Sequence, residues 1–344
     1  MAMIKNAPSL DDWKKLYDLM AQLKDLAPWD WMEEDDIFGI QIPKTGELGF
    51  ISVMGTLGEH LAVAVYQGVK GLGGFWQMHS IGPKLTPEFA LQIPQVQASF
   101  EDRDLIAKED HDVMKQLGLK YRGAQAWPQF RSYRPGCFPW FIDKGEAKIL
   151  ICALEQVLEM APRFKENPDL FMPATDQDYL VRVNNNNTWE DTVQQVIPRD
   201  EKILDLQMNE EALDHLRTLM PGKFILEIDF YMMEEPVQEK RNERPFFPFM
   251  LMLADHESGM IVSVDMLTPI PSIEEMWSEI PAIVTEKLAD DLPPKEINVK
   301  DDMLYFLLQP VAEEVGFNLK KQPRLKQIDR AKKELQKFTR SIGF

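Results

Sequence analysis

The stretch Phe249-Met250-Leu251-Met252-Leu253 leads through Ala254–Gly259 into Met260-Ile261-Val262-Ser263-Val264-Asp265. Two short apolar runs on either side of turn-forming residues predict a β-hairpin. The earlier stretch Phe50–Tyr66 aligns with it without a gap, at an offset of 249 − 50 = 199 residues. Similarity at a fixed offset is typical of an internal repeat, in which each copy is one supersecondary unit. The sequence therefore predicts two related units.

The same offset reaches a second feature, an aspartate between a strand-like and a helix-like segment. Asp102 corresponds to Asp301, because 301 − 102 = 199, and an aspartate in this position is typical of a helix N-cap. Each half then has the order strand, strand, helix, strand, helix. This order predicts an α/β fold with two related domains, each a small mixed sheet flanked by helices. We expect the helix-linked strands to pair in parallel with their neighbours.

Local composition divides the chain further. Apolar residues at helical spacing over Leu10–Leu26 predict a helix. The asparagine run Asn184–Asn187 predicts a loop, because its side chains favour turns over ladders. We therefore expect an N-terminal helical segment (1–35), a first α/β domain (36–166), a linker (167–200) and a second α/β domain (201–344).

Composition indicates a globular protein of the cytoplasm. The 344 residues are 44% hydrophobic and 27% charged, which is ordinary for such a protein. No apolar run approaches the roughly 20 residues that cross a bilayer, and the first residues lack a signal peptide, so we expect no membrane association. With only Cys137 and Cys152, neither a disulfide framework nor a cysteine-rich zinc site is expected.

Charge limits the classes of partner. The chain has 38 basic and 56 acidic residues, a net charge of −18, which opposes general binding to nucleic acid. The exception is the basic C-terminal segment Leu319–Phe344. Its cations are Lys320, Lys321, Arg324, Lys326, Arg330, Lys332, Lys333, Lys337 and Arg340. They form either a solvated helix face or a strip that docks an acidic partner or a nucleic acid.

Several motifs in the first half resemble an uncharacterised family of bacterial proteins of unknown function. They include Pro28-Trp29-Asp30-Trp31-Met32, Phe38–Pro43, Gly46–Phe50 and the later Arg134-Pro135-Gly136. The resemblance implies a bacterial, cytoplasmic protein with two domains. It supplies no catalytic residues.

The second half resembles the ribonuclease-H-like superfamily in the order and spacing of its elements. In that superfamily one strand with an aspartate begins a hairpin, and a later strand ends in a second aspartate before a helix. The matching residues would be Asp255, Asp301 and Asp302, which could bind Mg²⁺ or Mn²⁺ for phosphoryl transfer. A third carboxylate could come from Glu313, Glu314 or Glu334. The alternative is that Asp255 belongs to a turn, whereas Asp301 and Asp102 cap helices.

Other residues allow both a structural and a functional interpretation. His60 and His256 occupy the two hairpin turns and could form an acid–base cluster if the halves face each other, or could simply be solvated. Cys137 has no base nearby in sequence, which favours a buried thiol over a nucleophile. The aromatic segments Trp127–Trp140 and Pro245–Phe249, and the methionines of the second hairpin, indicate either core packing or a surface that binds a protein partner.

We therefore expect a non-catalytic binding or adaptor protein that has no cofactor, because neither copy contains a complete catalytic set. The alternative is a metal-dependent phosphoryl-transfer or nuclease-like enzyme. That alternative requires Asp255 and Asp301 or Asp302 to converge within about 4–6 Å, so that they can share metal ions.

Overall fold

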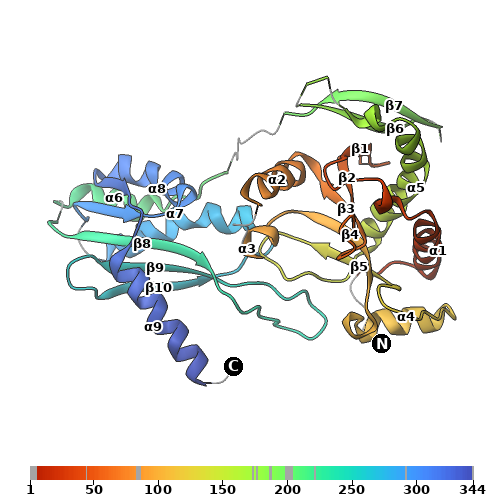
Figure 1. The fold of residues 1–344 in the computed structure, drawn as a ribbon. Coiled ribbons are helices and arrows are strands. Elements are labelled where there is room, and N and C mark those ends of the chain that lie inside the picture. Colours follow the sequence, from red (N-terminus) through yellow and green to blue (C-terminus); the bar gives the residue numbers. More distant parts are fainter. Residues whose placement is uncertain are drawn as a thin grey trace. The chain divides into compact units, whose positions relative to one another are not determined.

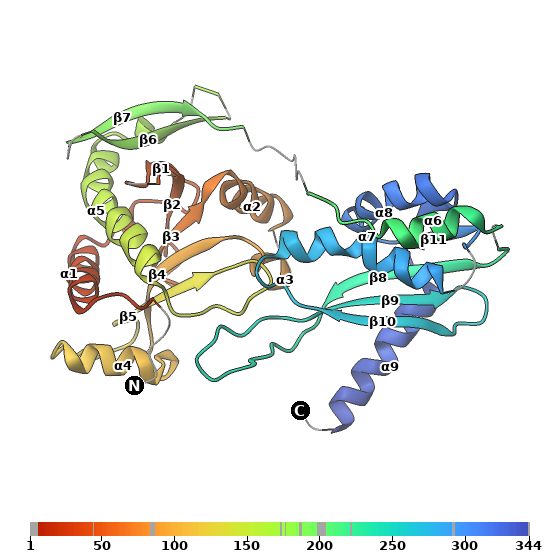
Figure 2. The ribbon, with the colours of Figure 1, turned by 180° about the vertical axis from the view of Figure 1, so that it is seen from behind.

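The computed structural model describes residues 6–43, 45–82, 87–172, 174–175, 177–185, 188–197, 204–220, 222–290 and 293–342. The chain has a mixed α/β fold in two compact units (Figures 1 and 2). Unit 1 comprises Met1–Glu201 and Gln238–Pro245, and unit 2 comprises Lys202–Val237 and Phe246–Phe344. Each unit has its own sheet and its own core.

Unit 1 contains a seven-stranded sheet with the order β5-β4-β3-β2-β1-β6-β7. Its strands are β1 (Phe38–Gln41), β2 (Leu48–Met54), β3 (Ala62–Gln67), β4 (Gln95–Glu101), β5 (Trp127–Tyr133), β6 (Asp178–Asn185) and β7 (Thr188–Gln195). Its helices are α1 (Leu10–Leu26), α2 (Gly68–Ile81), α3 (Pro87–Ala90), α4 (Lys108–Gln116) and α5 (Lys144–Glu166), with short 3₁₀ turns η1 (Pro28–Asp30), η3 (Arg103–Leu105) and η4 (Pro168–Phe171). All neighbouring strands are antiparallel except β1 and β6.

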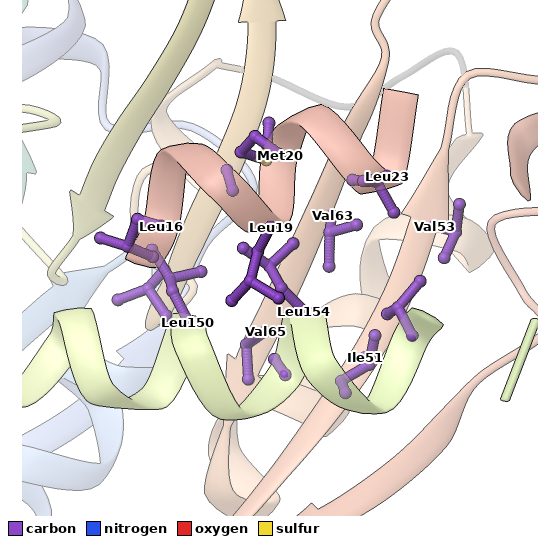
Figure 3. Packing of buried hydrophobic residues seen from close by; sticks show 14 of the residues in the cluster. Leu16, Leu19, Met20, Leu23, Ile51, Val53, Val63, Val65, Leu150 and Leu154 are labelled. Carbon is purple, nitrogen blue, oxygen red and sulfur yellow. The ribbon is translucent and has the colours of Figure 1, made fainter. Parts of the chain in front are cut away.

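Helices cover both faces of this sheet. Because side chains alternate along a strand, Ile51 and Val53 of β2 point into a core formed with α1 and α5 (Figure 3). Phe50 points to the opposite face, where α2 covers it. Helix α1 is fixed at its start by a capping box between Ser9 and Asp12. The hydrogen bond from the Ser9 hydroxyl also lowers the pKa of Asp12.

Unit 2 contains a five-stranded sheet with the order β10-β9-β8-β11-β12. Its elements are α6 (Glu210–Thr218), β8 (Ile225–Met232), β9 (Phe249–Asp255), β10 (Ile261–Leu267), α7 (Ile273–Ala289), β11 (Glu296–Val299), α8 (Asp302–Val315), β12 (Asn318–Lys321) and α9 (Lys326–Ile342). Strands β8, β9 and β10 are antiparallel, whereas β11 is parallel to both β8 and β12. Helices α6, α7 and α8 pack on one face, and α9 packs on the other.

The structure corrects three sequence predictions. The predicted linker 167–200 contains the hairpin β6–β7, which extends the sheet of unit 1 and includes Asn184 and Asn185; Asn186 and Asn187 lie outside the described residues. The predicted separate segment 1–35 contributes α1 to the core of unit 1. Strand β4 follows a helix but pairs antiparallel with β3 and β5, so the expected parallel pairing holds for β11 and not for β4.

The internal similarity corresponds to one hairpin in each sheet. Strands β2 and β3 pair antiparallel, as do β9 and β10, in agreement with the two predicted hairpins. Their places in the sheets differ, however, because β3 lies between β2 and β4, whereas β10 is an edge strand. In the β9–β10 hairpin of unit 2, the outer side of β10 therefore has no neighbouring strand of the sheet.

Candidate binding surface

The first predicted site residue, Asp255, lies where β9 ends and the turn to β10 begins. Its Oδ1 accepts hydrogen bonds from the amide of Ser258 (2.7 Å) and from the Ser258 hydroxyl (2.6 Å). These hydrogen bonds lower the pKa of the Asp255 carboxyl. The carboxylate is thus engaged in the turn, because an aspartate that accepts from the residue three positions ahead stabilises a turn locally.

Asp301 and Asp302 lie at the start of α8. Asp301 is its N-cap, and its Oδ1 accepts from the amides of Met303 (2.8 Å) and Leu304 (3.2 Å). Asp302 forms an exposed ion pair with Lys321. Asp102, the counterpart of Asp301, precedes the short turn η3 without capping it, and its Oδ1 accepts from the amide of Gln125 (2.8 Å) instead.

The strand register separates Asp255 from Asp301. Asp255 is opposite Leu226 on β8, and Leu226 is opposite Ile297 on β11. Asp301 lies four residues beyond Ile297, at the other end of the sheet. With strands about 4.8 Å apart and a rise of about 3.3 Å per residue, the two Cα atoms are separated by about 16 Å. The two carboxylates therefore do not reach the separation at which they could share a metal ion.

The other expected ligands do not join them. Glu313 accepts from Gln309, and Glu314 pairs with Arg217. Across the described parts of the chain, no group of three or more histidine, cysteine, aspartate or glutamate side chains is arranged to hold a metal ion.

Sequence reasoning missed a buried carboxylate in unit 2, Glu227 on β8. The side chain is 1% exposed. Its Oε1 lies 2.7 Å from Nδ1 of His256, and its Oε2 accepts from the amides of Gln327 (2.8 Å) and Ile328 (3.1 Å) at the start of α9. Glu227 therefore fixes both the β9–β10 turn and the N-terminus of α9 to the sheet. The available signal was two acidic residues, Glu227 and Asp229, among the apolar residues of one strand, because a buried carboxylate requires a specific partner.

The second histidine of interest, His60, has different surroundings within unit 1. Its Nε2 lies 3.0 Å from Nε2 of Gln97, whose Oε1 accepts a hydrogen bond from the Tyr133 hydroxyl (3.0 Å). His60 Nδ1 is 3.8 Å from Glu101. His60 and His256 therefore each contact polar groups of their own unit.

A polar cluster in unit 1 surrounds the start of α5. Glu146 accepts hydrogen bonds from the Ser132 hydroxyl (2.6 Å) and from Arg134 (2.9 Å). Arg244, in the segment Gln238–Pro245, donates to the carbonyl and the hydroxyl of Ser132, both at 2.8 Å. The neighbouring Cys137 is buried, and burial raises the pKa of its thiol, as expected for a structural rather than a nucleophilic cysteine.

The aromatic segments contribute little open surface. Phe130 is buried in the core of unit 1 and Phe249 in that of unit 2. Phe138 is the aromatic residue of these segments with the largest exposure, at 42%. Exposed apolar surface is instead concentrated on β10.

The four sheet edges of the described chain differ in how they are protected. Exposed edges template pairing with other chains unless charge, proline or a covering segment prevents it. Strand β12 carries Lys320 and Lys321, β7 carries Glu190 and Asp191, and β5 contains Pro128 and is bridged by Trp140. Strand β10 has seven residues without lysine, arginine or proline, and the carboxylate of Asp265 lies 3.4 Å from Lys287. A register shift lies between Ile261 and Ser263, and beyond it the residues Ser263–Leu267 form the least protected of the four described edges.

The apolar strip consists of Met260, Ile261, Val262, Val264 and Met266, on β10 and immediately before it. Their exposed fractions are 65%, 39%, 45%, 49% and 63%, respectively. Val264 and Met266 are opposite Met252 and Met250, whose side chains α9 covers. Cross-strand partners project from the same face of a sheet. The apolar strip thus lies on the same face of the sheet as α9, next to the part of that face that α9 covers.

The cationic stripe consists of Lys326, Arg330, Lys333 and Lys337 on α9. Their spacing of four, three and four residues places them on one side of the helix. All four are exposed, and within the described residues none has an ion pair, although Lys332 pairs with Asp229 of β8. Arg330 reaches the β9–β10 turn, because a Cβ added at Gly259 would lie 2.5 Å from Nη2 of Arg330.

Comparison with known proteins finds two matching domain models, and neither has an assigned activity. Residues 13–182 match a domain of unknown function, DUF7309, which covers most of unit 1. Residues 212–336 match another domain of unknown function, DUF6930, which covers most of unit 2 together with the segment Gln238–Pro245 of unit 1. No curated protein matches the chain. In the described residues, no helix has the length and apolar character needed to span a membrane. The chain thus contains matches to two domains of unknown function, DUF7309 and DUF6930, which support an uncharacterised family.

Proposed function

We propose that the chain is a non-catalytic binding protein that accepts a strand of a protein partner along β10. In this mode of recognition an extended segment adds to a sheet edge, so that main-chain hydrogen bonds supply affinity and alternate side chains supply specificity. The observation that carries the proposal is the apolar strip on the least protected of the four described edge strands.

The strip has the features that such binding uses. Its residues are large and apolar, and their burial under a partner contributes roughly 25 cal/mol per Å² of apolar surface removed from water. Two of its members are methionines, whose flexible side chains adapt to different partners. Met250 and Met252, by contrast, are buried and fill the core beneath α9.

The expected metal-dependent alternative receives less support. Asp255 is engaged by the β9–β10 turn, and Asp301 caps α8. Their separation also leaves no shared site for Mg²⁺ or Mn²⁺ at these residues. The binding proposal needs neither residue and includes no cofactor.

The proposal places the protein in the bacterial cytoplasm. Cys137 and Cys152 are both buried and free, which suits a reducing compartment. The bacterial origin follows from the family resemblance of the N-terminal motifs.

The test is selection of a phage-displayed library of random peptides on the full chain. We expect the selected peptides to share alternating β-branched or apolar residues and to lose binding to Val264→Lys. The matched control is Val193→Lys, which places the same charge on β7 at an exposed apolar position. Peptides that bind wild type and Val264→Lys equally well would contradict the proposal.

A further inference from the structure

We infer that the cationic stripe of α9 binds the phosphate backbone of duplex DNA without reading its sequence. The inference concerns a second surface of unit 2 and does not depend on strand addition at β10. The observation behind it is a row of exposed cations, without ion-pair partners in the described residues, on one helix of a strongly acidic chain.

Positive charge is gathered at one end of the sequence. The segment Leu319–Phe344 has 9 basic and 2 acidic residues, a net charge of 9 − 2 = +7, so the rest of the chain carries −18 − 7 = −25. Within this segment Lys320, Lys321 and Lys332 form ion pairs with carboxylates of unit 2. The four cations of the stripe do not, as far as the described residues extend. The stripe is thus a cationic surface that unit 2 leaves without neutralisation.

The stripe lies on the outer side of α9. At 3.6 residues per turn its four cations fall within about 60° of arc. Ile328, Ala331 and Leu335 lie on the opposite side of the helix, where they pack on the sheet. Figures 1 and 2 show that the C-terminal half of α9 extends beyond the strands of this sheet. The stripe is therefore open to a large ligand, and its 337 − 326 = 11 residue steps span about 16 Å.

The acidic residues of α9 leave the stripe uninterrupted. Asp329 and Glu334 lie on either side of it, each about 70° from its centre around the helix. Carboxylates elsewhere on the chain act more weakly, because charges in solvent that are more than about 8 Å apart are largely screened at physiological ionic strength. A phosphate in contact with a stripe cation is therefore attracted to it more strongly than it is repelled by distant carboxylates.

The composition of the stripe favours nucleic acid over an acidic protein segment. The stripe consists of three lysines and one arginine, with no apolar residue among them. Ion pairs between exposed side chains contribute little to association, and protein interfaces depend on buried apolar or aromatic anchors. Binding to a phosphate backbone needs no such anchor, because it is driven by the release of counterions condensed on the nucleic acid.

Among polyanions, duplex DNA fits the stripe best. Proteins that bind single strands stack bases on aromatic rings, and the stripe has none. Recognition of an RNA duplex adds contacts to its 2′-hydroxyls, and lysine and arginine have no acceptor for a hydroxyl proton. A helix that binds an anionic membrane inserts its apolar side, whereas the apolar side of α9 is packed on the sheet. Phosphate contacts alone carry no sequence information.

The experiment measures binding of the full chain to a fluorescent DNA duplex of about 20 base pairs at several salt concentrations. Four neutralised phosphates predict a slope of about −3.6 for the logarithm of affinity against that of salt, or a loss of about 150-fold between 50 and 200 mM. Lys326→Gln/Lys333→Gln removes two cations and should halve the slope to about −1.8. Lys108→Gln/Lys115→Gln is the matched control, because it makes the same change at exposed lysines seven residues apart on α4. The control should keep the wild-type slope, and both variants should keep the wild-type melting temperature.

Several results would overturn the inference. Wild type that does not bind the duplex at 50 mM salt, or a stripe variant that keeps the wild-type slope, would show that the stripe is only a solvated helix face. A polyglutamate peptide that binds more tightly than the duplex would favour an acidic protein partner. Tighter binding of a DNA single strand or of an RNA duplex would exclude duplex DNA as the preferred ligand. Strand addition at β10 is tested separately, by the peptide selection.

Discussion

Val264 on β10 is directly opposite Met252 on β9, yet Met252 is 4% exposed and Val264 is 49% exposed. The two side chains project from the same face of the sheet, because they are cross-strand partners. Leu325, which precedes α9, and Ile328 of α9 pack with Met252, whereas Val264 is left in solvent. The boundary between core and binding surface in unit 2 therefore runs between two neighbouring strands.

This boundary predicts opposite effects for one substitution at the two positions. Val264→Lys should change the free energy of unfolding by no more than about 0.5 kcal/mol, because the side chain is already half exposed. Met252→Lys should cost more than about 3 kcal/mol, because it buries a charge without a partner. Urea denaturation of both variants measures the difference. Equal costs would show that Val264 belongs to the core.

The two aspartates at the start of α8 should differ in their contribution to stability. Asp301→Ala should cost about 1 kcal/mol, because two amides at the helix N-terminus lose their acceptor. Asp302→Ala should cost less than about 0.5 kcal/mol, because it removes only an exposed ion pair. Thermal melting with and without Mg²⁺ should give the same shift for Asp301→Ala. A shift that appears only with Mg²⁺ would favour a metal role for Asp301.

The buried carboxylate of Glu227 predicts a local effect on α9. Glu227→Gln should cost about 1–3 kcal/mol, because one of its buried partners is left without an acceptor. Amides of the first turn of α9 should exchange hydrogen faster than in wild type. The control is Glu257→Gln, an exposed neighbour in the β9–β10 turn. Unchanged exchange at Gln327 and Ile328 would contradict the role assigned to Glu227.

Asp191 predicts a pH dependence in unit 1. Hydrogen bonds from Arg163 and Arg182 lower the pKa of Asp191 below its usual value of 3.8. A carboxyl whose pKa is depressed by folding stabilises the protein above its unfolded pKa and loses this contribution as pH falls through its folded pKa. Wild type should therefore exceed Asp191→Asn in stability at neutral pH, and the difference should shrink below about pH 4. A difference that grows on acidification would contradict the assigned ion pair.

Both cysteines should react slowly in the folded protein. Burial raises the pKa of Cys137 and raises that of Cys152 to about 12. Because the thiolate is the reactive species, alkylation at mildly alkaline pH should be slow for the native chain and fast in denaturant. Rapid modification of native Cys137, measured by mass spectrometry, would instead indicate an accessible and activated thiol.

Local sequence patterns predicted the elements well, and long-range pairing explains the exceptions. Strand β11 (Glu296–Val299) fits the predicted order of elements, because Ile297 and Val299 alternate with polar residues and a helix follows. Strand β6 was missed, because its asparagines favour turns. Tyr179 and Val181 nevertheless pack into the core beside α2, and this burial outweighs the local preference.

The candidate binding surface, too, could be predicted from the sequence only in part. The cationic stripe is visible in the spacing of Lys326, Arg330 and Lys333. The open edge is not visible, because Met250 and Met266 have the same local context in the sequence. Only the order of the strands buries the first and exposes the second.

The most direct test of strand addition is amide hydrogen exchange of the full chain with a peptide selected as described above. An edge strand leaves alternate amides unpaired, and a partner strand pairs them. The account predicts slower exchange over Ile261–Leu267 in the presence of peptide, with no change over Thr188–Gln195 of β7. Protection that appears elsewhere, with β10 unchanged, would contradict the assignment of β10 as the binding edge.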